Sequence, residues 1–172
     1  MLNQRVNTGI ISIAFAACVI LLAFQSTVLA SKIGELRVVR SDGKIVTYSS
    51  HDLAKLPQHT LTTHTAWTPG SHEFAGVRLA DLLKASGIEP KAKEYSHVIA
   101  SALNDYVIDI PFEDVAKYNV LVATSMDGQL LTVRDKGPYW LVYPRDQFEE
   151  LRDPRFDNRW AWQLKELRMK TR

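Results

Sequence analysis

Cysteine is almost absent from this sequence, because Cys18 is the only one among 172 residues. It lies within an apolar N-terminal stretch that is typical of a removable export signal. Once such a signal is removed, the mature chain has no cysteine, which excludes a disulfide, a cysteine nucleophile and a metal held by a protein thiolate. Packing must then stabilise the exported domain, and four tryptophans are the obvious core material.

Other missing features narrow the function further. The formal net charge is only +2, so the chain gives no reason to expect nucleic acid or an acidic membrane surface as a partner. No Gly-x-Ser-x-Gly segment, Walker loop or Gly-x-Gly-x-x-Gly run occurs, so nucleophilic hydrolysis and nucleotide binding have no support. No repeat, low-complexity run or linker-like stretch follows the N-terminal segment, which predicts a single domain.

The N-terminal segment has its features in the order of an export signal. Arg5 is the one charge before an apolar run from Ile10 to Phe24, and Val28-Leu29-Ala30 offers suitable residues to a signal peptidase. We predict a signal peptide over residues 1–30, cleaved after Ala30, and a periplasmic or secreted domain over residues 31–172.

Two alternatives to cleavage after Ala30 stay open. An uncleaved N-terminal membrane anchor is one, because Ile10 to Ala30 is about as long as the roughly 20 residues needed to cross a bilayer. A lipoprotein attached through Cys18 is the other, although it leaves an apolar stretch behind the cysteine. With the signal cleaved, we expect no stable membrane insertion.

After the signal, strand and helix patterns alternate in short segments. The predicted strands are Glu35 to Arg40, Lys44 to Tyr48, His59 to Trp67, Tyr95 to Leu103, Tyr106 to Ile110, Val120 to Met126, Gln129 to Val133, Tyr139 to Tyr143 and a closing strand from Trp160. The predicted helical segments are Ser50 to Leu56 with Ser50 as its cap, Leu79 to Leu83, Glu113 to Tyr118 and Arg145 to Arg152. In the closing strand, Trp160, Trp162 and Leu164 fall on one face, whereas Leu167 and Met169 fall on the other, which predicts a bulge near Lys165-Glu166. The pattern predicts an α+β fold that is mostly β, with mixed sheets and a few short helices.

Four of the five histidines lie between His51 and His72, a grouping that raises the question of a metal site. His59 and His64 are five positions apart, so they point to opposite faces of a continuous strand. We therefore predict solvated or hydrogen-bonded histidines and no metal site.

One segment, Phe74-Ala75-Gly76-Val77-Arg78-Leu79-Ala80-Asp81-Leu82-Leu83, resembles the aromatic-x-Gly-x-x-Leu-x-x-Leu-Leu motif of the molybdopterin-binding domain of sulfite-oxidase-type oxidoreductases. Further matches, in the family's order, are Asn104-Asp105-Tyr106 with Ile110-Pro111, Leu121-Val122-Ala123 to Asp127-Gly128-Gln129-Leu130-Leu131, Gly137-Pro138 to Pro144, and Trp160 to Met169. The resemblance covers about Leu61 to Met169 and implies that family's fold.

Two departures from the family bear on function. The resemblance implies a molybdenum-ligating cysteine on the strand before the aromatic-x-Gly segment, but the register places Thr63 or His64 there. It also implies an arginine just before Leu141 that helps to hold an anionic cofactor or substrate, and this chain has Trp140. A neutral hydroxyl is a poor substitute for a soft thiolate, and an indole cannot pair with an anion.

Five side chains are candidates for lining a remaining cleft, and through the resemblance for binding a cofactor: His64, Asn104, Tyr106, Arg134 and Lys136. We assign no catalytic residue and expect no cofactor. The preferred hypothesis is an exported, non-catalytic module, a pseudoenzyme candidate, that binds an envelope protein such as a sensor or a small anionic ligand. The alternative is a molybdopterin-dependent oxidoreductase that holds its cofactor without a protein thiolate. Whether the chain is an enzyme stays open.

Overall fold

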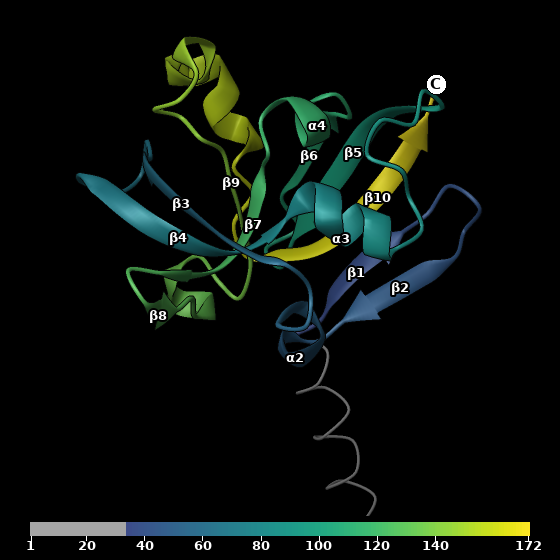
Figure 1. The fold of residues 1–172 in the computed structure, drawn as a ribbon, viewed down its shortest axis with the longest axis horizontal. Coiled ribbons are helices and arrows are strands. Elements are labelled where there is room, and N and C mark those ends of the chain that lie inside the picture. The colour runs from purple at the N-terminus through teal and green to yellow at the C-terminus, as the bar shows by residue number, and fades with distance from the viewer. Residues whose placement is uncertain (1–33) are drawn as a thin grey trace, which may run out of the picture. The chain divides into compact units, whose positions relative to one another are not determined.

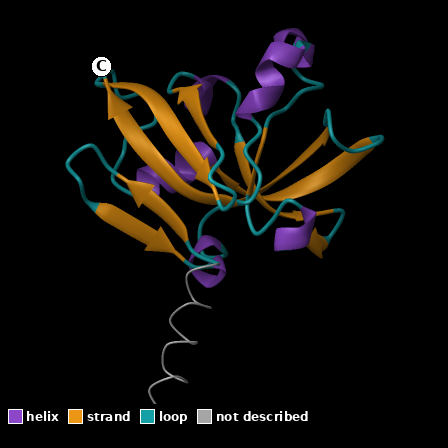
Figure 2. Ribbon diagram, turned by 180° about the vertical axis from the view of Figure 1, so that it is seen from behind, coloured by secondary structure: helices purple, strands orange, loops and turns teal. Residues whose placement is uncertain are grey.

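Ten strands form two five-stranded sheets within residues 34–172, the part of the chain that this computed structural model describes (Figures 1 and 2). The predicted signal peptide, its cleavage point after Ala30 and Cys18 all lie outside the described residues. Within residues 34–172, the helices are all too short or too polar to cross a membrane.

Sheet A joins the two ends of the described chain. Its strands, in spatial order, are β2 (Ile45–Tyr48), β1 (Leu36–Val39), β10 (Leu164–Thr171), β5 (Tyr95–Ala102) and β6 (Val107–Pro111). The β1–β10 pair is parallel and the other pairs are antiparallel, so the sheet is mixed. The register of β10 against β5 shifts between Leu164 and Glu166, which confirms the bulge predicted there.

Sheet B is antiparallel. It consists of β3 (Gln58–His64), β4 (Ser71–Arg78), β7 (Leu121–Met126) and the short β8 (Gln129–Leu130), while β9 (Trp140–Val142) also pairs with β7. Gly76 lies where β4 comes closest to β7, because a Cβ atom there would lie only 2.1 Å from the carbonyl oxygen of Val122. The sheet therefore requires the absence of a side chain at this position.

The helices are short, as predicted, but several boundaries differ. They are α2 (Ser50–Leu53), α3 (Leu79–Ala85), α4 (Asp114–Lys117) and the 3₁₀ segments η1 (Val133–Asp135), η2 (Glu149–Arg152) and η3 (Pro154–Arg159). Ser49, not Ser50, caps α2, since its hydroxyl accepts from the backbone N–H of Asp52. The predicted strand at Gln129 to Val133 ends at Leu130, and Arg145 to Arg152 contains only the η2 turn.

The closing strand also begins later than predicted, at Leu164 instead of Trp160. Gln163 adopts a positive φ of 53°, which breaks the extended backbone just before the strand. Trp160 and Trp162 therefore belong to an irregular segment that leads into β10.

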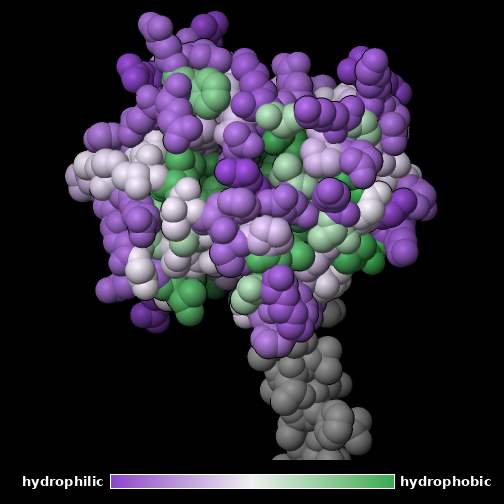
Figure 3. Space-filling view, viewed as in Figure 1, coloured by the Kyte–Doolittle hydropathy of each residue, from purple (hydrophilic) through white to green (hydrophobic). Residues whose placement is uncertain are grey.

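Both sheets contribute to one hydrophobic core, which includes Leu36, Val38 and Leu167 from sheet A and Phe74, Val122 and Trp140 from sheet B. Helix α3 lies on one face of sheet A (Figures 1 and 2). On the face seen in Figure 3, hydrophilic residues predominate and hydrophobic ones form small separate patches. The predicted fold class, α+β and mostly β with mixed sheets, is confirmed.

Candidate functional site

Four tryptophans from distant parts of the chain meet at one place. Trp67 follows β3, Trp140 lies on β9, and Trp160 and Trp162 precede β10. The Trp67 ring centroid lies 5.2 Å from that of Trp162, 5.7 Å from Trp160 and 6.4 Å from Trp140. The Trp67–Trp162 and Trp67–Trp140 pairs are edge-to-face, an arrangement that aromatic quadrupoles favour. Trp140, which is fully buried, anchors this tryptophan cluster to sheet B.

A cavity of about 250 Å³ opens beside the tryptophan cluster. Its lining combines aromatic rings with a few polar groups, namely Trp67, Asn104, Tyr106, Asp157, Asn158, Trp160 and Trp162. We refer to it as the tryptophan cavity.

The polar groups of the tryptophan cavity come from two segments that hold each other. Asn104 shapes the turn between β5 and β6, where its side-chain oxygen accepts from the backbone N–H of Tyr106 at 3.2 Å. The Tyr106 hydroxyl donates to the backbone carbonyl of Asn158 at 2.9 Å, which joins this turn to η3. The Tyr106 side chain remains partly exposed.

The one charged side chain in the lining of the tryptophan cavity pairs with an arginine that lies outside the lining. Asp157 is the one carboxylate in its lining, and it accepts a hydrogen bond from the Arg145 guanidinium. Among the residues that the structure describes, none of the arginines or lysines lines the cavity. An anion would therefore find no cationic partner there.

Two buried indole N–H groups, those of Trp140 and Trp160, find no acceptor among the described residues. A buried donor without an acceptor costs about 1–3 kcal/mol, so such groups call for an explanation. Trp160 also lines the tryptophan cavity. The N–H itself is buried, so other atoms of the Trp160 side chain form the lining.

A buried ion pair fixes η3, which supplies Asp157 and Asn158. Asp114 at the start of α4 is 2 % exposed and accepts from Arg159 at 2.6 Å and from the Tyr143 hydroxyl at 3.1 Å. Burial raises the pKa of Asp114 above its usual value, and the Arg159 guanidinium opposes that rise. Burial likewise raises the pKa of Tyr143 well above its usual value.

Two of the five candidate cleft residues, Asn104 and Tyr106, line the tryptophan cavity, and the other three do not. His64 ends β3, and its backbone N–H donates to Asp146, whose carboxylate also lies 2.9 Å from its Nδ1. Arg134 is exposed on η1. The Lys136 ammonium lies 5.6 Å from the centre of a Trp140 ring, so it packs against the tryptophan cluster from outside the cavity.

Thr63 and His64 are the two residues at which the family's molybdenum-ligating cysteine would fall, and both form hydrogen bonds within the protein. Thr63 is fully buried, and its hydroxyl donates to the His64 carbonyl and accepts from the Asp146 N–H, each at 3.3 Å. Burial opposes a fall in the pKa of Asp146, but the hydrogen bonds from His64 hold that pKa below its usual value. The hydrogen bonds between His64 and Asp146 hold the end of β3 to the segment after β9.

The histidines of β3 and β4 each lie beside a different aspartate. His59 lies 2.9 Å from Asp81, and His72 lies 2.6 Å from Asp127. Between residues 34 and 172, no three His, Cys, Asp or Glu side chains are grouped so that they could hold a metal ion.

Five residues that line the cavity are absent from the candidates that the sequence offered. All four tryptophans were expected in the core, Trp67 at the end of a strand, and Asp157 and Asn158 belonged to no predicted element. Trp160 is 2 % exposed, whereas Trp162 is only partly buried and lines the cavity. Their grouping depends on how three distant segments fold together, for which the sequence carries no local signal.

Comparisons with known proteins agree with this architecture. The solved structure of the sulfane dehydrogenase SoxCD from Paracoccus pantotrophus is similar, with a TM-score of 0.62 and 20 % identity. The match covers 83 % of this chain but only 39 % of that protein's chain, so this chain spans well under half of its length. No curated protein matches the sequence. The family model of the oxidoreductase molybdopterin binding domain matches residues 34–148, and the chain therefore belongs to that family.

Proposed function

We propose that this chain is a non-catalytic ligand-binding module that keeps the molybdopterin-binding fold and binds a small molecule in the tryptophan cavity. The observation that carries the proposal is the lining of that cavity, in which three indoles and a phenol surround a few polar groups without an unpaired cation. A fold alone does not decide function, so the fit of the family's cofactor has to be tested on these residues.

The metal of that cofactor does not fit the donor set of this chain. Residues 34–172 contain no cysteine, and the Thr63 hydroxyl is buried and hydrogen-bonded. The His64 imidazole is held by Asp146 at the exposed end of β3. Neither group supplies the soft thiolate that the family's molybdenum site uses.

The anionic pterin phosphate does not fit the tryptophan cavity either. Phosphate groups are normally held by Arg, Lys or several backbone N–H groups, and here the one charged side chain is Asp157. Trp140, in the position where the family tends to place an arginine, is fully buried in the tryptophan cluster. The volume of about 250 Å³ is also below the roughly 300–1,000 Å³ of sites for drug-sized ligands.

The lining instead favours a small ligand that is neutral or positively charged. Indole faces stack on flat apolar groups and attract cations, while the Asn104 amide offers a polar contact. We also propose that the module acts in the cell envelope, as its N-terminal segment suggests, and that a partner such as a sensor reads its ligand state.

The competing function is a molybdopterin-dependent oxidoreductase. The family match over residues 34–148 favours it, because members of this family bind molybdopterin. The two functions differ in what the purified protein should contain.

Elemental analysis by plasma mass spectrometry, with pterin fluorescence after acid oxidation, would test this on protein purified from its native host. We expect neither molybdenum nor pterin. Near-stoichiometric amounts of either would overturn the proposal in favour of the oxidoreductase.

Ligand binding can be followed by tryptophan fluorescence with tetramethylammonium and phenol as probes. We expect a saturable change that Trp162→Ala abolishes, because Trp162 is partly exposed and lines the tryptophan cavity. Phe148→Ala is the matched control, since Phe148 packs on Tyr118 away from the cavity. Equal responses of the two variants, or no saturable change with either probe, would contradict the proposed cavity.

A further inference from the structure

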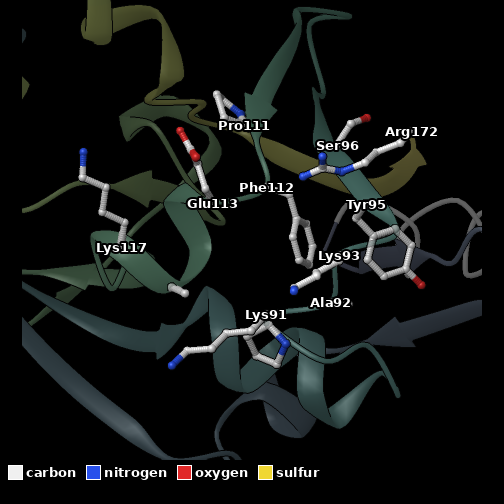
Figure 4. Close-up of a pocket in the computed structure, with 12 residues that line it drawn as sticks. Lys91, Ala92, Lys93, Tyr95, Ser96, Pro111, Phe112, Glu113, Lys117 and Arg172 are labelled. Carbon is white, nitrogen blue, oxygen red and sulfur yellow. The ribbon is translucent and has the colours of Figure 1, made fainter.

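A second and larger cleft, of about 450 Å³, lies at the end of sheet A where β10 finishes. It lies between the segment that leads into β5 and the segment that runs from β6 into α4 (Figure 4). Four of its lining residues are basic, namely Lys91, Lys93, Lys117 and Arg172, and one has an acidic side chain, Glu113. We call it the basic cleft.

The basic side chains differ in how they face the basic cleft (Figure 4). Lys93 and Arg172 extend toward the ring of Phe112, and Lys91 lies at the rim. Lys117 points away, and its ammonium pairs with Glu150 at 3.1 Å. Lys93 and Arg172 are therefore the cations best placed to meet a bound molecule.

Three of the basic side chains of the cleft have no acidic partner among residues 34–172. Lys91, Lys93 and Arg172 form no ion pair with another described residue. By contrast, two cations elsewhere on β10, Lys165 and Lys170, each pair with an aspartate. Unpaired charges of one sign in a concave surface focus the electrostatic potential and attract counter-ions.

The backbone around the basic cleft is held in place. The Arg172 N–H donates to the Glu94 carbonyl at 3.0 Å. The Ser96 hydroxyl donates to the carbonyls of Thr171 and Lys170, at 2.9 and 3.2 Å. These bonds fix the end of β10 against the start of β5, so that Arg172 and Lys93 stay on the same cleft without a ligand.

The wall of the basic cleft is apolar. The ring centroids of Tyr95 and Phe112 lie 5.1 Å apart, and Pro90 and Pro111 complete this part of the lining. The volume falls within the roughly 300–1,000 Å³ range of small-molecule sites, where a few placed polar groups orient a mostly apolar ligand.

We propose that the basic cleft binds a small organic anion, a phosphate ester or carboxylate with an apolar body. Lys93 and Arg172 pair with the anionic group, and the body lies against Phe112 and Tyr95. This site shares no lining residue with the tryptophan cavity, so the two sites can be tested independently.

Isothermal titration calorimetry of the full chain with phenyl phosphate, phenylacetate, inorganic phosphate and benzyl alcohol would test the site. We expect both organic anions to bind, inorganic phosphate to bind more weakly, and benzyl alcohol not to bind. The double variant Lys93→Ala/Arg172→Ala should weaken binding about tenfold or more, because it removes two charge-assisted contacts. Binding should also vanish near 1 M salt, where the Debye length is only about 3 Å.

Lys84→Ala is the matched control, since Lys84 is exposed on α3, forms no ion pair with another described residue and lies outside the cleft. Its affinity for the organic anions should be unchanged, and thermal unfolding of every variant should match that of the parent. Equal binding by the double variant and the parent would refute the proposal. So would equal weakening by Lys84→Ala, or no binding of either organic anion at low salt.

Discussion

Replacing Asp114 by alanine should destabilise the protein strongly and loosen one wall of the tryptophan cavity. The change removes the acceptor of two groups, the fully buried Tyr143 hydroxyl and the Arg159 guanidinium. Arg159 lies at the end of η3, whose residues Asp157 and Asn158 line the cavity. The ion pair therefore connects the stability of the fold to the shape of the site.

The expected loss follows from these two groups. Leaving a buried hydroxyl without an acceptor costs about 1–3 kcal/mol, and removing one partner of a buried ion pair costs about 3–5 kcal/mol. The Arg159 side chain keeps 22 % of its surface exposed, so its charge can turn toward water and the cost stays at the lower end. We expect the free energy of unfolding to fall by about 3 kcal/mol.

The complementary change, Arg159→Met, should have a pH-dependent effect. Burial already raises the pKa of Asp114, and loss of the guanidinium raises it further. The folded variant then keeps a proton that the unfolded chain has released, so stability is greatest below the unfolded pKa and falls as pH rises through the folded pKa. The cost of the substitution should therefore shrink on acidification, by up to about 1.4 kcal/mol for each pH unit between the folded pKa of Asp114 in the variant and its folded pKa in the parent.

Urea unfolding followed by tryptophan fluorescence at pH 7 and pH 5 would measure these effects, and the double variant completes a thermodynamic cycle. Arg155→Met is the matched control, because Arg155 lies on the same 3₁₀ segment but its pair with Asp153 is exposed. It should leave stability unchanged at both pH values. Additive effects of the Asp114 and Arg159 substitutions, or a cost for Arg159→Met that does not depend on pH, would refute the reasoning.

Three further predictions concern the core. Gly76→Ala should lower the free energy of unfolding by about 3 kcal/mol or more, because its Cβ would overlap the Val122 carbonyl; urea unfolding measures this loss, and parental stability would contradict it. Trp140→Arg, which introduces the residue that the family tends to have, should cost more than about 4 kcal/mol by burying a charge, and molybdenum analysis should show no gain of metal. The Tyr139 hydroxyl donates to the Gly34 carbonyl, and burial raises its pKa to about 12. The unfolded chain loses this proton near pH 10, so the free energy of unfolding should fall between pH 10 and 12. Tyr139→Phe should remove that part of the fall in alkaline unfolding curves.

Local signals predicted the elements that depend on local chemistry. The two strands predicted on either side of Asp127-Gly128 are joined there by a turn with positive φ at both residues, 50° and 76°, as a tight hairpin requires. The strand predicted over Val120 to Met126 is observed as β7, Leu121–Met126, with neighbours on both edges. The α2 cap was misplaced by one residue because Ser49 and Ser50 are adjacent and both are good capping residues.

The candidate site was harder to predict because it depends on long-range contacts. Trp67 and Asn158 line one cavity although about half of the chain separates them. Asn104 and Tyr106, which the family resemblance suggested as cleft residues, line this cavity, whereas His64, Arg134 and Lys136 lie outside its lining. Whether a side chain faces a cavity depends on tertiary packing, to which residue type and spacing are only indirectly related.

The position of β10 has a consequence for how the protein is made. This strand lies in the middle of sheet A, parallel to β1 and antiparallel to β5, yet it is built from residues 164–171. During synthesis, β1 can pair with β2 and β5 with β6, but each must wait for that segment to leave the ribosome before its second edge is paired. An interrupted chain would present two unpaired strand edges, which makes incomplete products ready substrates for proteases and chaperones.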